Sequence, residues 1–287
     1  HSLIKIFHLY KIFKSNKISH LFTYLTKPNF YGAIIGRLAG IKHIYGSIRS
    51  SKLPRWKIIL EKIATSYFSS ATIFNSYAGE NIFKDKGIKK TIVIPNCLPD
   101  ISTSFKRPQK VKIKIISVGR FVQEKDYFTA IKSIKELIIN TEKFVFQIVG
   151  YGPLENKIRS KIAELELEDT IEIFINPDNI AELLREADIY LSTSLFEGTS
   201  NSIMEAMNAC LPIVATNVGD NSRLISEGVS GFLHNIGDYA AMAESLKLLI
   251  DDYDKRIAFG IASHEILNEN YSYDNFKYRY LKLMANE

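Results

Sequence analysis

The stretch Asp188–Asn217, DIYLSTSLFEGTSNSIMEAMNACLPIVATN, decides the fold prediction for this chain. Two short apolar runs, Ile189–Ser192 and Pro212–Thr216, are typical of buried strands. The spacing of apolar residues in Ser202–Ala209, between the two runs, predicts a helix. A strand, a helix and a further strand in close succession predict a βαβ unit with parallel strands.

The turn Phe196–Asn201 between the first strand and the helix predicts a ligand site. The N–H groups and the dipole at a helix start favour an anion. The carboxylate of Glu205, which we expect in the first turn of the helix, accepts hydrogen bonds from hydroxyls. These features suit a ligand with phosphate and polyol parts, such as a nucleotide sugar. In the alternative interpretation, Ser202-x-x-Glu205 is a capping box that needs no ligand.

A family resemblance favours the first interpretation. The chain resembles the retaining glycosyltransferases with the GT-B fold, in particular the family 4 group that builds bacterial surface glycans. Their E-x7-E motif is matched by Glu197 and Glu205, with Gly198, Asn201 and Ala206. The similarity extends from about Ile18 to about Tyr280. It implies an α/β chain with two Rossmann-like domains and a nucleotide-sugar donor bound by the second domain.

The first part of the chain matches only part of such a domain. Strands alternating with helices predict a parallel sheet, but this part holds about four strands, where a full doubly wound domain has about six. We therefore expect residues 1–97 to be an incomplete N-terminal domain on the acceptor side. The predicted strands are Ile18–Tyr24, Lys42–Gly46, Ala71–Asn75 and Thr91–Ile94, and the predicted helices are 2–14, Asn29–Ala39, Pro54–Ser69 and Tyr77–Lys86.

The remaining chain predicts a linker at residues 98–110, a nucleotide-sugar-binding Rossmann-like domain at 111–270, and a helix at 271–287 that returns to the first domain. The predicted strands are Val111–Val118, Phe144–Val149, Thr170–Phe174, Ile189–Ser192, Pro212–Thr216 and Gly231–His234. The predicted helices outside the central stretch are Tyr127–Asn140, Leu154–Leu165, Ile180–Glu186, Asp238–Ile250 and Lys255–Asn268.

The resemblance assigns a role to each donor-side residue. Arg120 and Lys125, which lie between a strand that ends before Gly119 and a predicted helix start, hold the donor diphosphate. Glu205 accepts hydrogen bonds from the ribose, and Glu197 orients the sugar and acts as the catalytic carboxylate. Backbone amides help to bind phosphate and sugar at Gly198, Thr199, Ser200 and Asn201.

The resemblance assigns fewer residue roles on the acceptor side. Arg49 follows a strand end, where ligands gather in open α/β sheets, and is a candidate for contact with an acceptor phosphate. Relatives often carry a His-x-His pair where this chain has His20 and Phe22. We therefore expect His20, at the end of a strand segment, to be a structural residue with satisfied ring nitrogens.

Charge is unevenly distributed along the 287 residues. Residues 1–60 contain eleven Lys or Arg and no Asp or Glu, although the net charge of the whole chain is only +6. This segregation predicts an anionic partner for residues 1–60, such as an anionic membrane surface or a lipid diphosphate; a solvated basic face is the alternative. Nucleic acid is not expected, because the aromatic residues there have spacings that fit strands and a core.

The location prediction rests on what the sequence lacks. No apolar run reaches the roughly 18 residues of a membrane-spanning helix, and there is no signal-peptide pattern. Cys97 and Cys210 are too few for a disulfide framework. We expect a cytoplasmic protein that associates peripherally with the inner face of the membrane if residues 1–60 bind lipid. Residues 2–14 fit an amphipathic helix on lipid, or a surface helix of the domain.

These patterns predict an enzyme that transfers a sugar from a nucleotide-diphosphate sugar, with UDP-sugar favoured, to a glycan or lipid-linked acceptor. No cofactor and no metal site are expected. Asp252-Tyr253-Asp254 has D-x-D spacing but lies between two predicted helices, where an exposed turn is expected. The alternative function is nucleotide-sugar binding without transfer, in an epimerase or an inactive fragment.

Overall fold

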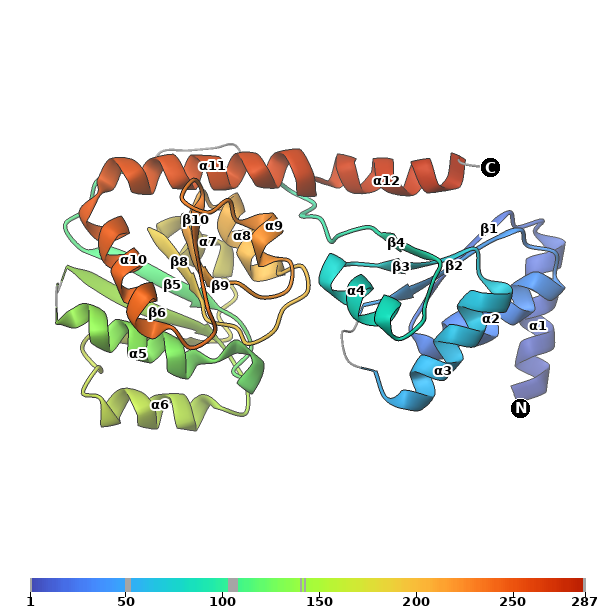
Figure 1. The fold of residues 1–287 in the computed structure, drawn as a ribbon, viewed down its shortest axis with the longest axis horizontal. Helices are drawn as coiled ribbons and strands as arrows, with labels where there is room; N and C mark the ends of the chain where they lie inside the picture. Colours follow the sequence, from blue (N-terminus) through green and yellow to red (C-terminus); the bar gives the residue numbers. More distant parts are fainter. Residues whose placement is uncertain (1, 50–52, 103–107, 140, 142, 286–287) are drawn as a thin grey trace. The chain divides into compact units, whose positions relative to one another are not determined.

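The computed structural model describes residues 2–49, 53–102, 108–139, 141 and 143–285. It divides into two compact units. Unit 1 comprises His1–Asn96 and Phe276–Glu287, and unit 2 comprises Cys97–Asn275. Each unit has a parallel sheet flanked by helices (Figure 1). The two units match the predicted α/β class with two Rossmann-like domains. Residues 103–107 of the predicted linker lie outside the described residues, as does Asn140 at the predicted end of a helix.

Unit 1 contains a four-stranded parallel sheet in the order β1-β2-β3-β4. Its strands are β1 (His20–Tyr24), β2 (His43–Ile48), β3 (Ala71–Phe74) and β4 (Thr91–Val93). Its helices are α1 (Ser2–Ser15), α2 (Thr26–Leu38), α3 (Arg55–Ile63), a π-helical turn at Ala64–Phe68, α4 (Tyr77–Asp85) and the part of α12 (Tyr273–Ala285) from Phe276 onward.

The core of unit 1 draws on both ends of the chain. Phe13 of α1 packs into the cluster that contains Ile44 of β2. On α12, Phe276, Tyr280 and Leu283 pack against Tyr45 and its buried neighbours. Phe13 therefore anchors α1 as a surface helix of this unit. No described helix is both long and apolar enough to pass through a membrane.

Several boundaries in unit 1 differ from the prediction. The strand β2 ends at Ile48 instead of Gly46, and α3 ends at Ile63 instead of Ser69, where a π-helical turn follows it. His20 begins β1 instead of ending a strand segment, and α2 begins at Thr26 instead of Asn29. Pro28 fits within the first turn of α2, where a missing N–H breaks no helical hydrogen bond. Asn29 is a residue type that favours the start of a helix. Here its side chain instead bonds residues distant in sequence, because its Nδ2 donates to the Ser47 carbonyl and to Glu61 Oε1, each at 3.1 Å.

Unit 2 contains a six-stranded parallel sheet in the order β10-β9-β8-β5-β6-β7. Its strands are β5 (Ile113–Val118), β6 (Phe144–Gly150), β7 (Ile171–Ile175), β8 (Ile189–Ser192), β9 (Ile213–Thr216) and β10 (Gly231–His234). Its helices are α5 (Tyr127–Ile138), α6 (Glu155–Glu164), α7 (Ile180–Glu186), α8 (Asn201–Asn208), α9 (Asn221–Leu224), α10 (Tyr239–Asp251) and α11 (Tyr253–Tyr271).

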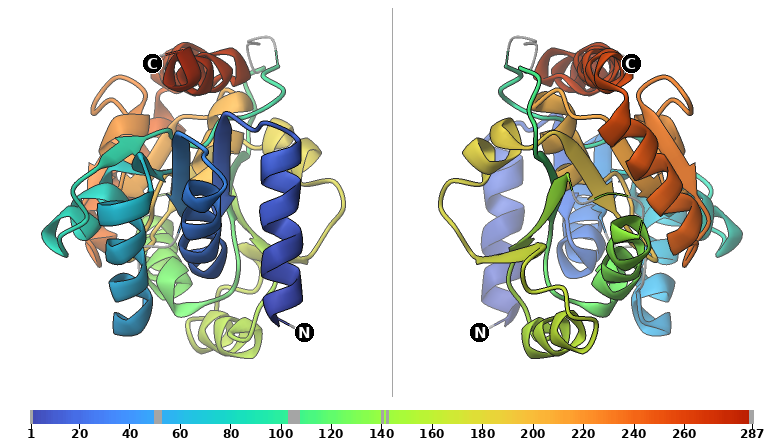
Figure 2. Two further views of the ribbon diagram at one scale, coloured as in Figure 1. Left: turned by 90° about the vertical axis from the view of Figure 1, so that its right-hand side faces the viewer. Right: turned by 90° about the vertical axis from the view of Figure 1, so that its left-hand side faces the viewer.

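Helices cover both faces of this sheet (Figure 2). On one face, residues of α5, α6 and α10 pack with Ile115 of β5. On the other, residues of α7, α8, α9 and α11 pack with Ile116 of β5. Successive strand residues point to opposite faces, so a strand covered on both sides has to be apolar throughout. This explains the continuous apolar runs that the sequence shows.

The strand order of unit 2 reverses at β5. The chain runs from β5 through β6 to β7 at one edge, and then returns to place β8 on the other side of β5. At such a switch point the loops that leave two neighbouring strands diverge and open a crevice at the carboxyl edge of the sheet. The loops that follow β5 and β8 contain Arg120, Lys125 and Glu197. The fold therefore brings these three predicted site residues to one edge of the sheet.

The burial of Glu61 in unit 1 predicts a pH-dependent stability. Its side chain is 2% exposed and lies next to Asn29 and Thr26. Burial raises the pKa of Glu61 from an ordinary 4.5 to about 7, although hydrogen bonds from Asn29 and Thr26 oppose the rise. Between these two values the folded chain keeps a proton that the unfolded chain has lost. The free energy of unfolding should therefore fall by about 3 kcal/mol as the pH rises through this window.

Glu61→Gln should remove this loss. As the pH rises from about 4.5 to about 8, the free energy of unfolding of wild type should fall by about 3 kcal/mol relative to that of Glu61→Gln. The chain has one tryptophan, Trp56 on α3, so its fluorescence during urea unfolding reports on unit 1. Glu80→Gln is the control, because the Glu80 carboxylate contacts Lys84 Nζ at 2.9 Å. A parallel pH response in Glu61→Gln and wild type would contradict the assignment.

Candidate functional site

Two loops of unit 2 are bonded together at the switch point. The first follows β5 and ends in a 3-10 turn, Gln123–Lys125, and the second follows β8. The Thr193 hydroxyl donates to the carbonyls of Lys125 at 3.2 Å and Asp126 at 2.8 Å. The Leu195 N–H donates to the Glu124 carbonyl at 2.8 Å. These bonds fix the two predicted donor loops against each other.

Lys125 and Glu197 form an ion pair across these loops. Lys125 Nζ lies 2.6 Å from Glu197 Oε1, and the Ser194 hydroxyl donates to the same oxygen at 2.8 Å. The side chains of Lys125 and Glu197 are 22% and 11% exposed, so the pair is partly shielded from water. A charge-assisted bond is stronger when it is shielded in this way. Arg120 is exposed close by in sequence, and in the described part of the chain no carboxylate pairs with its guanidinium.

A third loop, after β9, supports the backbone of the Glu197 turn. The Thr216 hydroxyl donates to the Ser194 carbonyl at 2.6 Å, and the Thr199 hydroxyl donates to Asp220 Oδ2 at 3.0 Å. Gly219 has a φ of +59°, and a Cβ there would lie 2.2 Å from the Glu197 carbonyl oxygen. Only glycine fits this position without a shift of the backbone.

Sequence reasoning gave no role to Asp220 and did not single out Ser194. Both are buried, and both act on the Glu197 turn, Ser194 through the carboxylate and Asp220 through Thr199. A usable signal was present, since each is a polar residue that closely follows a buried strand of the same sheet. The carboxyl ends of parallel strands share one edge, so such residues gather there.

The start of α8 carries no side-chain cap. Ser200 is the N-cap residue, but its hydroxyl lies 3.3 Å from the Ser202 hydroxyl instead of bonding an amide of the first turn. The alternative interpretation of Ser202-x-x-Glu205 as a capping box is wrong, because α8 begins at Asn201 and Ser202 is already helical. Ser200 and Thr199 are buried, Gly198 is partly buried and Asn201 is exposed. A helix start without a side-chain cap suits an anion.

Glu205 lies in the second turn of α8, which corrects the predicted first turn. It lines a pocket of about 360 Å³ within unit 2, together with Leu98, Asp100, Ile180, Arg185 and Asn208. Burial raises the pKa of the Glu205 carboxyl above its ordinary value. Glu205 therefore does not join the ion pair.

Tyr190 of β8 connects the two carboxylates electrostatically. It is 1% exposed, and its hydroxyl donates to the Val118 carbonyl at 3.2 Å. Burial is the main cause that raises the pKa of Tyr190, and the charges of Glu197 and Glu205 both add to the rise. The two glutamates of the E-x7-E pattern thus act on one buried phenol from separate positions.

Arg49 is placed in unit 1, at the end of β2. Its guanidinium lies 5.3 Å from the centre of the Tyr24 ring and hydrogen bonds with Tyr280. Burial and a hydrogen bond with Tyr24 raise the pKa of Tyr280, and the charge of Arg49 opposes the rise. Arg49 is exposed, and no described carboxylate pairs with it.

The expectation of a satisfied His20 is wrong for one ring nitrogen. His20 stacks on His43 with ring centres 4.6 Å apart, and its Nδ1 lies 3.0 Å from the Ser19 hydroxyl. Its Nε2 is buried and has no hydrogen-bond partner among the described residues. His20 and His43 begin β1 and β2, so they lie at the edge of the sheet opposite to Tyr24 and Arg49.

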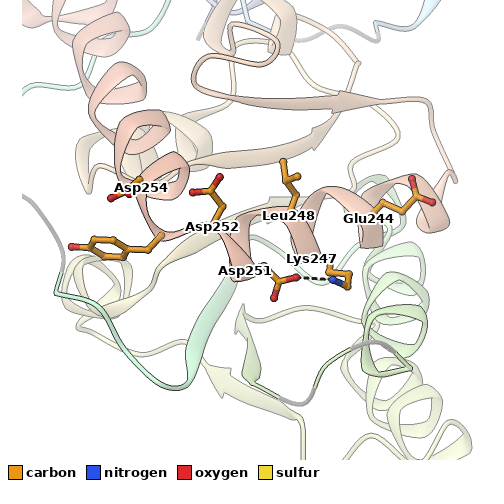
Figure 3. A pocket seen from close by; sticks show the side chains of 7 residues that line it. Glu244, Lys247, Leu248, Asp251, Asp252 and Asp254 are labelled. Atoms are coloured by element: carbon orange, nitrogen blue, oxygen red, sulfur yellow. Dashed lines mark hydrogen bonds and ion pairs between the residues drawn. The ribbon is translucent and has the colours of Figure 1, made fainter.

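The D-x-D residues have local structural roles (Figure 3). Asp252 caps α11 by accepting a bond from the Lys255 N–H at 2.9 Å, and the neighbouring Asp251 pairs with Lys247 Nζ at 2.6 Å. Asp254 lies in the first turn of α11, not in the predicted turn between helices. Within the described ranges, no group of three or more His, Cys, Asp or Glu side chains could hold a metal ion.

Comparison with known proteins identifies similar glycosyltransferases. The chain is 35% identical over 142 residues to the amylovoran biosynthesis glycosyltransferase AmsK of Erwinia amylovora, which covers 47% of this chain and 35% of that protein. It is 25% identical over 295 residues to the Escherichia coli UDP-Gal:alpha-D-GlcNAc-diphosphoundecaprenol alpha-1,3-galactosyltransferase, which covers 93% of this chain and 76% of that protein. A putative colanic acid biosynthesis glycosyltransferase, WcaL of Escherichia coli, is matched over 58% of its length.

Solved structures share the fold. Anabaena HepE in complex with UDP superposes with a TM-score of 0.86 at 17% identity, over 98% of this chain and 82% of that one. The sucrose-phosphate synthase of Thermosynechococcus elongatus gives a TM-score of 0.78 at 15% identity, over 98% and 78% of the two chains. These likenesses assign the GT-B fold.

The family model described as glycosyl transferases group 1 matches residues 101–265. The match covers more than half of the chain and includes the loops after β5, β8 and β9 that build the site in unit 2. The chain belongs to the glycosyl transferases group 1 family.

Proposed function

We propose that the chain transfers a sugar from a nucleoside diphosphate sugar to a glycan or lipid-linked acceptor, with retention of the anomeric configuration. The observation that carries this proposal is the ion pair of Lys125 and Glu197 at the β5/β8 switch point. A cation for a diphosphate and a carboxylate for a sugar meet there beside a helix start without a side-chain cap. Family 4 is the proposed subgroup, on the E-x7-E pattern.

The donor diphosphate is held by positive charge on three sides. Lys125 and Arg120 contribute cations from the loop after β5, and the start of α8 contributes its dipole and the amides near Gly198–Asn201. When the bond between the sugar and the diphosphate breaks, negative charge grows on the leaving oxygen. Preformed positive charge at that point lowers the barrier. The same groups make a metal ion unnecessary for charge neutralisation, so we propose metal-independent transfer.

Glu197 serves the sugar. When the diphosphate takes Lys125, the carboxylate of Glu197 loses its cation and keeps the bond from Ser194. It then accepts hydrogen bonds from sugar hydroxyls and favours the positive charge that develops at the anomeric carbon. Glu205 accepts hydrogen bonds from the ribose.

The names of related proteins support the donor and acceptor classes. The Escherichia coli relative is named for UDP-Gal and for a diphosphoundecaprenol-linked acceptor. A neighbour of the same fold was solved with UDP-glucose. Other relatives are named for colanic acid and lipopolysaccharide core biosynthesis. We propose a UDP-sugar donor and a role in surface polysaccharide, lipopolysaccharide or glycolipid biosynthesis.

We also propose that residues 1–60 bind an anionic membrane surface from the cytoplasmic side. The outer side of α1 presents Ile4 and Phe7, 72% and 58% exposed, next to Lys5 and Lys11. Apolar side chains beside lysines are typical of helices that lie in a lipid interface. The absence of acids up to residue 60 adds attraction to anionic lipid. Nucleic acid is not proposed as a partner.

Lys125→Ala should weaken UDP binding about 10-fold to 100-fold, because a charge-assisted bond to phosphate is lost and the charge of Glu197 is left beside the diphosphate. Isothermal titration calorimetry with UDP measures the change. Lys114→Ala is the matched control, since it breaks an ion pair of similar length, 2.7 Å to Glu186, on the amino half of β5. Equal UDP affinity in wild type and Lys125→Ala would rule out the donor assignment.

Glu205→Ala should weaken UDP about 10-fold but leave inorganic pyrophosphate unchanged, because only UDP has a ribose. Lys125→Ala should weaken both. The two ligands, titrated into both variants, separate the two roles, with Glu186→Ala, on the exposed side of α7, as control. Loss of pyrophosphate binding in Glu205→Ala would place Glu205 at the phosphates and contradict the ribose role.

The membrane proposal is tested by sedimentation with vesicles of phosphatidylglycerol and phosphatidylcholine. Wild type should sediment at low salt and be released at high salt, because the attraction is electrostatic. Replacing Lys5, Lys11 and Lys14 together by Glu should abolish sedimentation. In the control variant, Lys62, Lys89 and Lys90 are replaced together by Glu. These lysines are exposed elsewhere on unit 1, so the control should keep most of the sedimentation of wild type. Equal sedimentation of both triple variants would contradict a role for α1.

A further inference from the structure

Unit 1 contains a pocket of about 590 Å³ that the donor site does not use. It is lined by the end of β1 and the start of α2 (residues 24–28), by the end of β2 and Arg49 (residues 47–49), by residues 53 and 54, and by Lys57 and Glu61 of α3. Its lining residues lie at the carboxyl ends of β1 and β2, which is the edge where open parallel sheets bind ligands.

A buried carboxyl group forms part of the pocket wall. Glu61 Oε1 and Oε2 each accept a bond from Asn29 Nδ2 at 3.1 Å, and Thr26 contributes a further side-chain bond. Asn29 is fixed in turn by its bonds to the Ser47 backbone. No described cation pairs with Glu61, and burying such a group costs free energy that an apolar side chain would save. Glu61 is thus a carboxyl group held in a fixed orientation at a ligand-sized cavity.

Three cations line the same pocket. They are Lys27, Arg49 and Lys57, and none of them pairs with a described carboxylate. The guanidinium of Arg49 is oriented by the Tyr24 ring and by the hydrogen bond with Tyr280. An oriented guanidinium without a carboxylate partner is suited to a phosphate.

The backbone at the mouth of the pocket adds a further indication. Leu25 has a φ of +77° and is 76% exposed, although a leucine gains nothing from that conformation. Strained backbone of this kind gathers at ligand sites, where the surrounding structure maintains it.

We propose that this pocket binds a phosphate-bearing, hydroxylated ligand, with Arg49 on the phosphate and Glu61 on a hydroxyl group. The inference rests on the proposed function, in which unit 1 holds the acceptor, and makes Glu61 a specificity-determining residue of that site. A bare phosphate needs no buried carboxyl, and a neutral polyol needs no set of three cations. A ligand that carries both groups uses the whole wall.

The protonation of Glu61 fits this role. Burial raises the pKa of Glu61 to about 7, so near neutral pH its carboxyl group is present in both forms. The protonated form donates to a hydroxyl oxygen and also accepts a bond, whereas an ordinary exposed carboxylate only accepts.

Calorimetric titration with glucose 1-phosphate, inorganic phosphate and glucose tests the proposal. Wild type should bind glucose 1-phosphate more tightly than it binds inorganic phosphate or glucose. Arg49→Ala should weaken glucose 1-phosphate at least about 10-fold, the effect of one charge-assisted contact. Arg55→Ala, an exposed arginine at the start of α3 that does not line the pocket, should leave it unchanged. Glu61→Gln should reduce the preference for glucose 1-phosphate over inorganic phosphate.

Two results would overturn the proposal: no binding of glucose 1-phosphate to wild type, or equal loss in Arg49→Ala and Arg55→Ala. The fluorescence of Trp56 verifies that unit 1 is folded in each variant. UDP affinity should stay the same in Arg49→Ala. If wild type binds glucose 1-phosphate but no UDP, the donor proposal fails while the pocket remains a binding site.

A final comparison separates a soluble from a lipid-linked source of the phosphate. Phosphatidylcholine vesicles with and without farnesyl diphosphate present the lipid form, and glucose 1-phosphate presents the soluble form. Retention of wild type, but not of Arg49→Ala, on the farnesyl diphosphate vesicles supports a lipid-linked ligand. Binding of glucose 1-phosphate without such retention supports a soluble one. If Arg49→Ala is retained as well as wild type, Arg49 does not hold a lipid-linked phosphate.

Discussion

The reversal of strand order at β5 is the constraint on which the chemistry of unit 2 depends. It makes the loops after β5 and β8 neighbours, and close backbone contacts then hold those loops in place. A Cβ at Gly150 would lie 1.9 Å from the Gly119 carbonyl oxygen, and one at Gly219 would lie 2.2 Å from that of Glu197. Glycines on β6 and after β9 thus allow Lys125 and Glu197 to meet.

Much of the fold could be predicted from the sequence, because buried parallel strands are apolar along their whole length and glycines mark the helix ends. The donor loops could also be predicted, since polar residues after such strands share one edge. The exact start of α8 could not, because Ser200, Asn201 and Ser202 are all good helix caps and only tertiary packing selects among them. Contacts such as Asn29 with Glu61, 32 residues apart, leave no local pattern at all.

Each unit contains a carboxyl group in a position that does not favour the stability of the fold. Glu61 is buried and Glu205 is partly buried, neither pairs with a cation among the described residues, and burial raises the pKa of each. Asp188, in contrast, is buried beside Lys110 Nζ at 3.0 Å and accepts the Lys114 N–H at 2.9 Å, as a structural carboxylate does. This contrast is why we propose a ligand-binding role for Glu61 and Glu205 and a structural role for Asp188.

Because Lys125 already contacts Glu197, the Glu197 carboxylate competes for Lys125 with any anion that approaches it. An incoming anion has to replace a charge-assisted bond of 2.6 Å before it gains anything. A small anion such as chloride offers too few contacts for that exchange, whereas a molecule that also carries a base and a sugar offers many. In the proposed donor site, the pair would therefore disfavour binding of abundant simple ions relative to binding of a rarer, larger ligand.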